Sequence, residues 1–226
     1  MKRITYAEKI KLSNYTTIKV GGSAEYFAEP NNIFEFIDLI KWANFNKNEC
    51  RIIGAGSNLL INNIFLKGLT ICTKKMKSIK IDPVLGHVEV DSGVMLPTLS
   101  NLLAKNGLEG GEWTIGIPGT IGGAICMNAG SGNLSLAKNL ISVRVIDSRT
   151  LDIYEIPKKE INFRYRFSPF QENNLVIISS KLKFKTNGNV DELLKTTKNI
   201  LKKKTSTQPY HLPSFGSVFI LSLIHI

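Results

Sequence analysis

One segment of the sequence, residues 107–132, carries nine of the chain's 18 glycines. Glycine loses more conformational freedom on folding than any other residue, so this density needs a physical reason. A flexible linker is a poor explanation, because linkers are polar and this segment also holds apolar residues: Trp113, Ile115, Ile117, Ile121, Ile125 and Met127. The pattern favours a folded segment whose backbone closely approaches a bulky, flat or phosphorylated ligand.

A second, shorter glycine motif follows an apolar strand predicted at residues 51–53. It reads Gly54-Ala55-Gly56-Ser57-Asn58, and such a loop can close consecutive backbone N–H groups around an anion. It is not a dinucleotide-binding fingerprint, because the third glycine is missing and residues 59–61 are predicted as a strand. It is not a Walker loop either, because no Gly-Lys-Ser/Thr follows. By itself, the motif is explained better by a tight turn than by a ligand.

The composition is that of a globular protein with a real core: 226 residues, 43% hydrophobic and 21% charged. The net charge of +11 favours anionic partners, namely nucleic acid, a membrane surface or phosphorylated ligands. The lysines lie in separate stretches without an RNA-binding aromatic motif or a zinc finger, which favours solvated surfaces and predicts no nucleic-acid or membrane partner. No apolar stretch reaches the roughly 20 residues of a membrane span, and the start lacks a signal peptide's apolar core, so we expect a cytoplasmic protein.

Metal and disulfide chemistry find little support in the sequence. The three cysteines, Cys50, Cys72 and Cys126, have no C-x-x-C spacing, and the histidines, His87, His211 and His225, have no partners at ligand spacing. We therefore predict no metal site.

The periodicity mixes helices and strands along the whole chain and predicts an α+β fold. One helix is expected at residues 33–46, capped by Asn32 with Glu35 three residues later, and another at 96–106, ended by Gly107. Strands are expected at 69–73, 87–91 and 175–184, with a hairpin formed by 141–146 and 151–156. Asn189 and Glu192 predict the start of a third helix, which ends in the basic run at 202–204.

Five ordered motifs resemble a known family. They are Asn14-Tyr15-Thr16-Thr17 followed by Val20-Gly21-Gly22; residues 54–61; residues 116–130; Tyr165-Arg166-Phe167-Ser168-Pro169-Phe170; and Gln208-Pro209 with residues 213–219. This order is similar to that of the UDP-N-acetylenolpyruvoylglucosamine reductase (MurB) family, and the last motif resembles its shorter, second type. The resemblance spans residues 14–219.

The resemblance implies a vanillyl-alcohol-oxidase/PCMH-like FAD-binding fold, in which two lobes hold the cofactor and a third domain closes over the substrate. FAD would be bound non-covalently by residues of both glycine motifs: Gly54, Ala55, Gly56, Ser57, Asn58, Leu59, Pro118, Gly119, Thr120, Gly122, Gly123, Ala124 and Asn128. NADPH would reduce the flavin. UDP-N-acetylglucosamine enolpyruvate would then take the hydride and give UDP-N-acetylmuramate for peptidoglycan, a UDP-N-acetylmuramate dehydrogenase activity.

Two residues match the family's catalytic positions. Hydride addition to the enolpyruvyl double bond places negative charge on the adjoining carboxylate, which a guanidinium stabilises, and Arg166 matches the family's arginine. The resulting carbanion needs a proton, and Ser217 matches the family's serine donor. Without the family, Arg166 would be interpreted as a surface charge and Ser217 as a turn hydroxyl. Arg164 is the expected surface arginine of the pair.

The resemblance also divides the chain. We expect a first FAD-binding lobe at residues 1–74, a second at 75–186, and the start of a substrate-binding domain at 187–219. After Phe219 the family continues with Lys-Asn-Pro and a late glutamate, whereas this chain has Ile220. The last six residues equal the translation of a common transposase-based sequencing-adapter end. We therefore expect 220–226 to be a non-native tail, and the chain alone to be an incompetent reductase that exposes Leu193, Leu194, Ile200 and Leu201.

Two other classes of function stay open at this point. An FAD-dependent alcohol or carbohydrate oxidase could share the same fold, but it would not accept electrons from NADPH. A basic nucleic-acid-binding module would lose its affinity for generic DNA steeply as salt rises.

Overall fold

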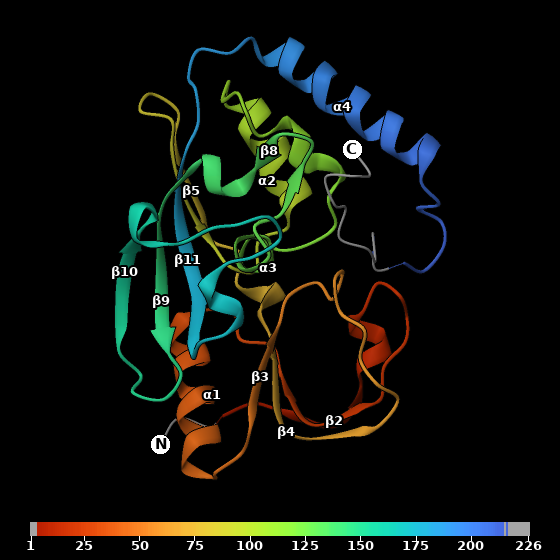
Figure 1. The fold of residues 1–226 in the computed structure, drawn as a ribbon, viewed down its shortest axis with the longest axis vertical. Coiled ribbons are helices and arrows are strands. Elements are labelled where there is room, and N and C mark those ends of the chain that lie inside the picture. The colour runs from red at the N-terminus through yellow and green to blue at the C-terminus, as the bar shows by residue number, and fades with distance from the viewer. Residues whose placement is uncertain (1–3, 215, 217–226) are drawn as a thin grey trace.

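Two β-sheets organise the computed structural model, which describes residues 4–214 and 216 (Figure 1). The first sheet has the strand order β1-β2-β4-β3. Its strands are β1 (Ala7–Lys11), β2 (Ser23–Ala28), β3 (Cys50–Ile53) and β4 (Phe65–Cys72). β1 is antiparallel to β2, whereas β2 and β3 both run parallel to β4. The chain therefore leaves β3 at the carboxyl edge of a parallel pair, where the first glycine motif begins.

The second sheet is antiparallel and has the strand order β10-β9-β11-β6-β5. Its strands are β5 (Ile79–Asp82), β6 (His87–Asp91), β9 (Leu140–Asp147), β10 (Ile153–Pro157) and β11 (Leu175–Lys183). One face packs against α2 (Leu96–Lys105) and α3 (Ile121–Cys126), in a core that includes Val88, Val90, Val143 and Val145 from the strands. The sheet therefore forms the base on which α3 rests.

Helix α1 (Ile33–Phe45) packs against both sheets. The Asn32 side chain caps it by accepting hydrogen bonds from the N–H groups of Phe34 and Glu35, as its sequence predicts. The helix buries Phe36, Leu39, Ile40 and Ala43 against Ile71 of β4. The same cluster includes Ile146 of β9 and Ile178 of β11. The two sheets therefore share one hydrophobic cluster.

Helix α4 (Val190–Thr207) packs on α2 and on the 3-10 helix η3 (Glu112–Gly116) (Figure 1). Our expectation that Leu193 is exposed is wrong: it is buried against these elements, whereas Leu201 stays exposed. The stem of Lys204 lies where a side chain at Gly116 would stand, and its ammonium donates to the Gly116 carbonyl at 3.3 Å. This partial burial lowers the pKa of Lys204.

Short elements complete the described chain. They are the strands β7 (Gly130–Ser131) and β8 (Leu134–Ser135) and the 3-10 helices η1 (Leu12–Tyr15), η2 (Thr73–Lys75), η4 (Leu136–Lys138), η5 (Lys158–Glu160) and η6 (Pro169–Gln171). None of the helices described is long and apolar enough to cross a membrane.

The structure confirms the predicted α+β class, both early helices and the hairpin, and it differs from the sequence-based predictions at three places. Residues 59–61 form no strand, because β3 ends at Ile53 and the chain does not enter β4 until Phe65. Helix α3 lies inside the glycine-rich segment and was not predicted. The third helix also extends to Thr207, beyond the predicted basic end.

Candidate functional site

The two glycine motifs singled out in the sequence lie against each other. Ser57 Oγ donates a hydrogen bond to the Pro118 carbonyl at 2.7 Å, across 61 residues of sequence. A Cβ on Gly54 would stand 2.3 Å from Thr120 Oγ1, so the end of β3 packs directly on the start of α3. One continuous surface therefore combines residues 54–58 with residues 118–123.

In the first motif, glycine is required by the protein itself. Gly56 has φ +67°, and a Cβ there would lie 2.0 Å from the Tyr15 carbonyl oxygen. The Thr17 N–H donates to the Gly56 carbonyl at 3.2 Å and holds the loop against the segment 14–17. Within the described residues, none of the backbone N–H groups of residues 55–58 donates a hydrogen bond. These successive free donors are the groups that an anion binds.

In the second motif, three successive backbone N–H groups are already used. Those of Ile121 and Gly122 donate to the carbonyls of Val94 and Ser92, each at 2.8 Å, and the N–H of Gly123 donates to Thr120 Oγ1. A Cβ on Gly122 would stand 2.8 Å from Ser92 Cβ, so this glycine lets α3 approach the end of β6.

The next glycine, Gly123, is different from Gly122. An added Cβ would meet only Thr120 Oγ1, at 3.5 Å, and no other atom within 4 Å. Protein packing therefore does not explain the glycine at this position. Its bare backbone is available to a flat ligand that lies on α3.

Asn128 follows the end of α3 and carries an unsatisfied acceptor. Its backbone has φ +41°, a conformation that asparagine tolerates better than most residues. Its Nδ2 donates to the Arg164 carbonyl at 2.8 Å, but its buried Oδ1 has no hydrogen-bond partner. A buried acceptor of this kind is expected to have a donor, and a ligand N–H or O–H would supply one.

Arg166 reaches the same surface from a tight turn. Arg164 and Phe167 pair through two backbone hydrogen bonds, and Arg166 sits between them with φ +56°. Its Nη2 donates to the Gly130 carbonyl at 3.2 Å, and its guanidinium lies 5.3 Å from the centre of the Tyr165 ring. Arg166 is half-buried whereas Arg164 is exposed, so Arg166 is the arginine directed to the second motif.

The predicted proton donor, Ser217, lies outside the described residues. Its described neighbour Ser214 donates its N–H to the Thr17 carbonyl at 3.2 Å, and Thr17 in turn holds Gly56. Upstream, the Tyr210 hydroxyl donates to the Gly116 carbonyl at 2.7 Å. The segment that follows α4 thus contacts Thr17, which holds the first motif, and Gly116, at the start of the second.

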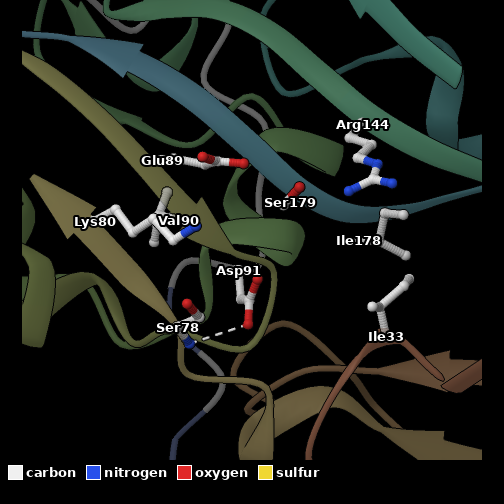
Figure 2. Close-up of a pocket in the computed structure, with 9 residues that line it drawn as sticks. All are labelled: Ile33, Ser78, Lys80, Glu89, Val90, Asp91, Arg144, Ile178 and Ser179. Atoms are coloured by element: carbon white, nitrogen blue, oxygen red, sulfur yellow. Dashed lines mark hydrogen bonds between the residues drawn. The ribbon is translucent and has the colours of Figure 1, made fainter. Parts of the chain in front are cut away.

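A separate pocket of about 120 Å³ is lined by residues of α1, β5, β6, β9 and β11 (Figure 2). Charged side chains from β5, β6 and β9 surround it: Lys80, Glu89, Asp91 and Arg144. Burial raises the pKa of Asp91, and a hydrogen bond from the Ser78 N–H partly opposes that shift. It contains none of the predicted site residues.

The part of the chain that the structure describes contains neither a cluster of metal ligands nor a disulfide. No group of three or more His, Cys, Asp or Glu side chains there could hold a metal ion. The three cysteines are free, and burial raises the pKa of the Cys50 thiol to about 12.

Sequence reasoning missed the groups that hold the site together. Thr17 lies in the motif at residues 14–17, but its hydrogen bond to Gly56 joins residues that are far apart in the sequence. Ser168 and Gln171 lie in or beside the motif at 165–170, and both donate to the Cys126 carbonyl at the end of α3, at 2.6 and 2.9 Å. No local pattern identifies such partners.

Comparison with known proteins identifies the family of this chain. Residues 24–150 match the FAD binding domain family. A UDP-N-acetylenolpyruvoylglucosamine reductase from Prochlorococcus marinus subsp. pastoris is 74% identical over 219 residues, which are 97% of this chain and 74% of that protein. The chain belongs to the UDP-N-acetylenolpyruvoylglucosamine reductase family. A family member from Synechococcus sp. strain CC9605 is 44% identical over 93% of this chain and 70% of its own length.

Solved structures of this family and of other enzymes have a similar fold. The family member from Thermus caldophilus superposes with a TM-score of 0.78 at 27% identity, covering 96% of this chain and 76% of that one. A 6-hydroxy-D-nicotine oxidase from Arthrobacter nicotinovorans matches with a TM-score of 0.58 at 18% identity, over 76% of this chain and 38% of that one, which shows a shared fold alone. The predicted PCMH-like FAD fold is therefore confirmed.

The described residues fit an FAD molecule. The free N–H groups of residues 55–58 suit a pyrophosphate, and the open backbone at Gly123 suits a flat ring system. The unsatisfied Asn128 Oδ1 suits a hydroxyl or ring N–H.

Proposed function

We propose that this chain reduces UDP-N-acetylglucosamine enolpyruvate to UDP-N-acetylmuramate, a step of peptidoglycan synthesis, with FAD as cofactor and NADPH as hydride donor. The contact between Ser57 and Pro118 carries the proposal, because it joins the two motifs of the family into one surface. The proposed FAD-binding lobes are residues 1–74 and 75–186, and residues 187–219 begin the substrate-binding domain.

The cofactor would be held without a covalent bond by the residues predicted from the sequence, Gly54 to Leu59, Pro118 to Thr120, Gly122 to Ala124, and Asn128. When bound, FAD supplies the hydride that it takes from NADPH. The first motif offers free N–H groups to the phosphates, and α3 offers its bare backbone at Gly123 to the rings. The side chains of the protein then have to orient the substrate.

Arg166 would bind the carboxylate of the enolpyruvyl group. Negative charge grows on that carboxylate as the double bond accepts hydride, so a fixed guanidinium stabilises the transition state more than the ground state. Its bond to the Gly130 carbonyl and its contact with the Tyr165 ring orient the guanidinium before the substrate arrives. Ser217 would donate the proton that completes the reaction.

The absorption spectrum of the purified chain tests the class of protein. A bound flavin is expected in this chain, and anaerobic NADPH should bleach it once the chain is lengthened with the C-terminal sequence of the Prochlorococcus marinus relative. An oxidase of the same fold would bind flavin but resist NADPH, and a nucleic-acid-binding module would carry no flavin and would lose DNA affinity steeply with salt. We propose that the protein acts in the cytoplasm, without a nucleic-acid or membrane partner.

Substrate turnover is best measured in a longer protein beside this chain, because the 219 matched residues are 74% of the family member from Prochlorococcus marinus. We therefore suggest a chimera in which residues 1–219 continue with the C-terminal sequence of that relative, and we call it the extended chain. Its flavin, once reduced by NADPH, should be reoxidised by UDP-N-acetylglucosamine enolpyruvate. Failure of this reoxidation would contradict the proposed function.

Changing the proposed donor Ser217 to alanine in the extended chain should separate the two half-reactions. Flavin reduction by NADPH should stay nearly intact, while substrate reduction should slow by about 10²–10⁴, the usual size of a general-acid contribution. Stopped-flow absorbance measures both rates. Equal slowing of both would contradict the assignment of Ser217 as proton donor.

A further inference from the structure

We infer that Gln171 is a positioning residue for the reaction, because its side-chain amide bonds the backbone carbonyl of Arg166 to the end of helix α3. The inference rests on the proposed function, since it concerns where the guanidinium of Arg166 meets the substrate. Gln171 was not among the site residues predicted from the sequence.

The starting observation is that Arg166 needs external support. Its φ of +56° lies in the left-handed region, which a non-glycine residue adopts at an energetic cost. Such a conformation persists only when surrounding contacts determine it, and it is typical of functional sites. The contacts that hold this turn therefore also fix the direction of the guanidinium.

Gln171 makes the contact that acts on Arg166 itself. It lies in η6, and its Nε2 donates to the Arg166 carbonyl at 3.2 Å and to the Cys126 carbonyl at 2.9 Å. An amide NH₂ has two N–H groups, so this side chain uses its full donor capacity on the two carbonyls. Among the described residues, no other group donates to the Arg166 carbonyl.

The other end of this link is anchored in the core. Cys126 is the last residue of α3, where backbone carbonyls lack an intrahelical partner. Its carbonyl also accepts from Ser168 Oγ at 2.6 Å, and Ser168 is fully buried. Because α3 packs in the core against the second sheet, Gln171 ties the turn at Arg166 to a helix that is itself held in place by buried side chains.

Two further bonds hold the surroundings of the turn but do not replace Gln171. Asn128 Nδ2 donates to the carbonyl of Arg164, at the start of the turn, and Arg166 Nη2 donates to the Gly130 carbonyl. The first fixes a neighbour, and the second acts on the guanidinium, whose other N–H groups stay available to the substrate carboxylate. Among the described residues, Gln171 is the side chain that bonds to the backbone of Arg166.

Gln171 is also a good residue to change, because its side chain is solvent-exposed and its loss should leave the core intact. We suggest Gln171→Met, which keeps an unbranched side chain of similar length but removes both donors. Asn139→Ala is the matched control: Asn139 Nδ2 donates to the Lys183 carbonyl at 3.0 Å in the same lobe, away from Arg166. Both variants should keep the flavin content and the thermal midpoint of the parent chain.

The test compares the two half-reactions in the flavin-loaded extended chain by stopped flow. Gln171→Met should slow substrate reduction by about 10- to 100-fold, the size expected when a catalytic group moves by about 1 Å. Flavin reduction by NADPH should change by less than about 2-fold, and Asn139→Ala should slow neither step. In an Arg166→Ala background, Gln171→Met should add almost nothing, because Gln171 acts only through Arg166.

Each outcome has a distinct meaning. If Arg166→Ala slows substrate reduction but Gln171→Met does not, or if the two losses multiply independently, the positioning role is wrong while the proposed function stands. If Arg166→Ala itself leaves substrate reduction unchanged, the proposed role of the arginine is wrong.

Discussion

The two glycine motifs of the candidate site use glycine in different ways. In residues 54–58, the glycine Gly56 faces the protein, where Tyr15 occupies the space of a side chain, and the backbone N–H groups stay free. In residues 118–124, the N–H groups of Ile121, Gly122 and Gly123 are bonded, and one glycine, Gly123, faces open space. Glycine content alone therefore does not show whether a glycine makes room for the protein itself or leaves its backbone open to a ligand.

Gly56→Ala should have the largest effect, and the effect should be on folding. The added Cβ would clash with a backbone carbonyl at 2.0 Å, and φ +67° is unfavourable for alanine. We expect a loss of about 2–4 kcal/mol in the free energy of unfolding, measured by urea denaturation of the flavin-free chain. A stability equal to that of the parent would show that this glycine serves the ligand instead.

Gly123→Leu should instead weaken flavin binding without lowering the stability of the protein. The structure leaves space for the Cβ of this side chain, and replacing a helical glycine favours the helix, so the stability of the flavin-free chain should be unchanged or higher. Flavin affinity should fall by about 10- to 100-fold, because the side chain occupies the space of the proposed ring system. Flavin fluorescence titration measures this change. An unchanged dissociation constant would contradict the proposed placement of the cofactor against α3.

Gly122→Ala tests the neighbouring position, one residue away on the same helix. Its Cβ would press on Ser92 at 2.8 Å, and the gain in helix propensity offsets part of that strain. We expect a net loss of about 1 kcal/mol in stability with little direct change in flavin affinity. If Gly122→Ala and Gly123→Ala behaved alike in both measurements, the distinction between the two faces of α3 would fail.

Ser57→Ala should give the smallest effect, since it removes the single hydrogen bond between the motifs. A loss of about 0.5–1.5 kcal/mol in stability is expected. A double-mutant cycle with Gly123→Leu, read out as flavin affinity, shows whether the two motifs bind the cofactor as one unit. Strictly additive losses would indicate two independent contacts.

Local patterns in the sequence predicted the elements that have local causes. Asn32 and Glu35 predicted the start of α1, and alternating residues predicted β9 and β10, because capping and face alternation depend on near neighbours. Helix α3 was missed because Gly122 and Gly123 oppose helix formation, and packing on the second sheet outweighs that preference. Thr120 at its N-cap is the signal that could have indicated it.

The candidate site also combines features with a local sequence signal and features that depend on the tertiary fold. The motifs predicted Arg166 and the glycine segments by position, but not the contacts that join them. Ser57 meets Pro118 across 61 residues, and Gln171 meets Cys126 across 45. Such pairs arise only after both sheets have formed, so no periodicity or spacing indicates them.

The cluster around α1 has a consequence for the affinity of the site. Ile146 and Ile178 of the second sheet pack in the same core as Phe36 and Ile71 of the first lobe, and Asn44 Nδ2 donates to the Ser148 carbonyl at 2.8 Å. Separating the lobes would expose this core to water, so the lobes unfold together instead of opening as a hinge. A ligand between them finds its two halves preassembled and loses no binding free energy to domain closure. Amides in β4 and β11 should accordingly share one high free energy of opening, measured by native-state hydrogen exchange.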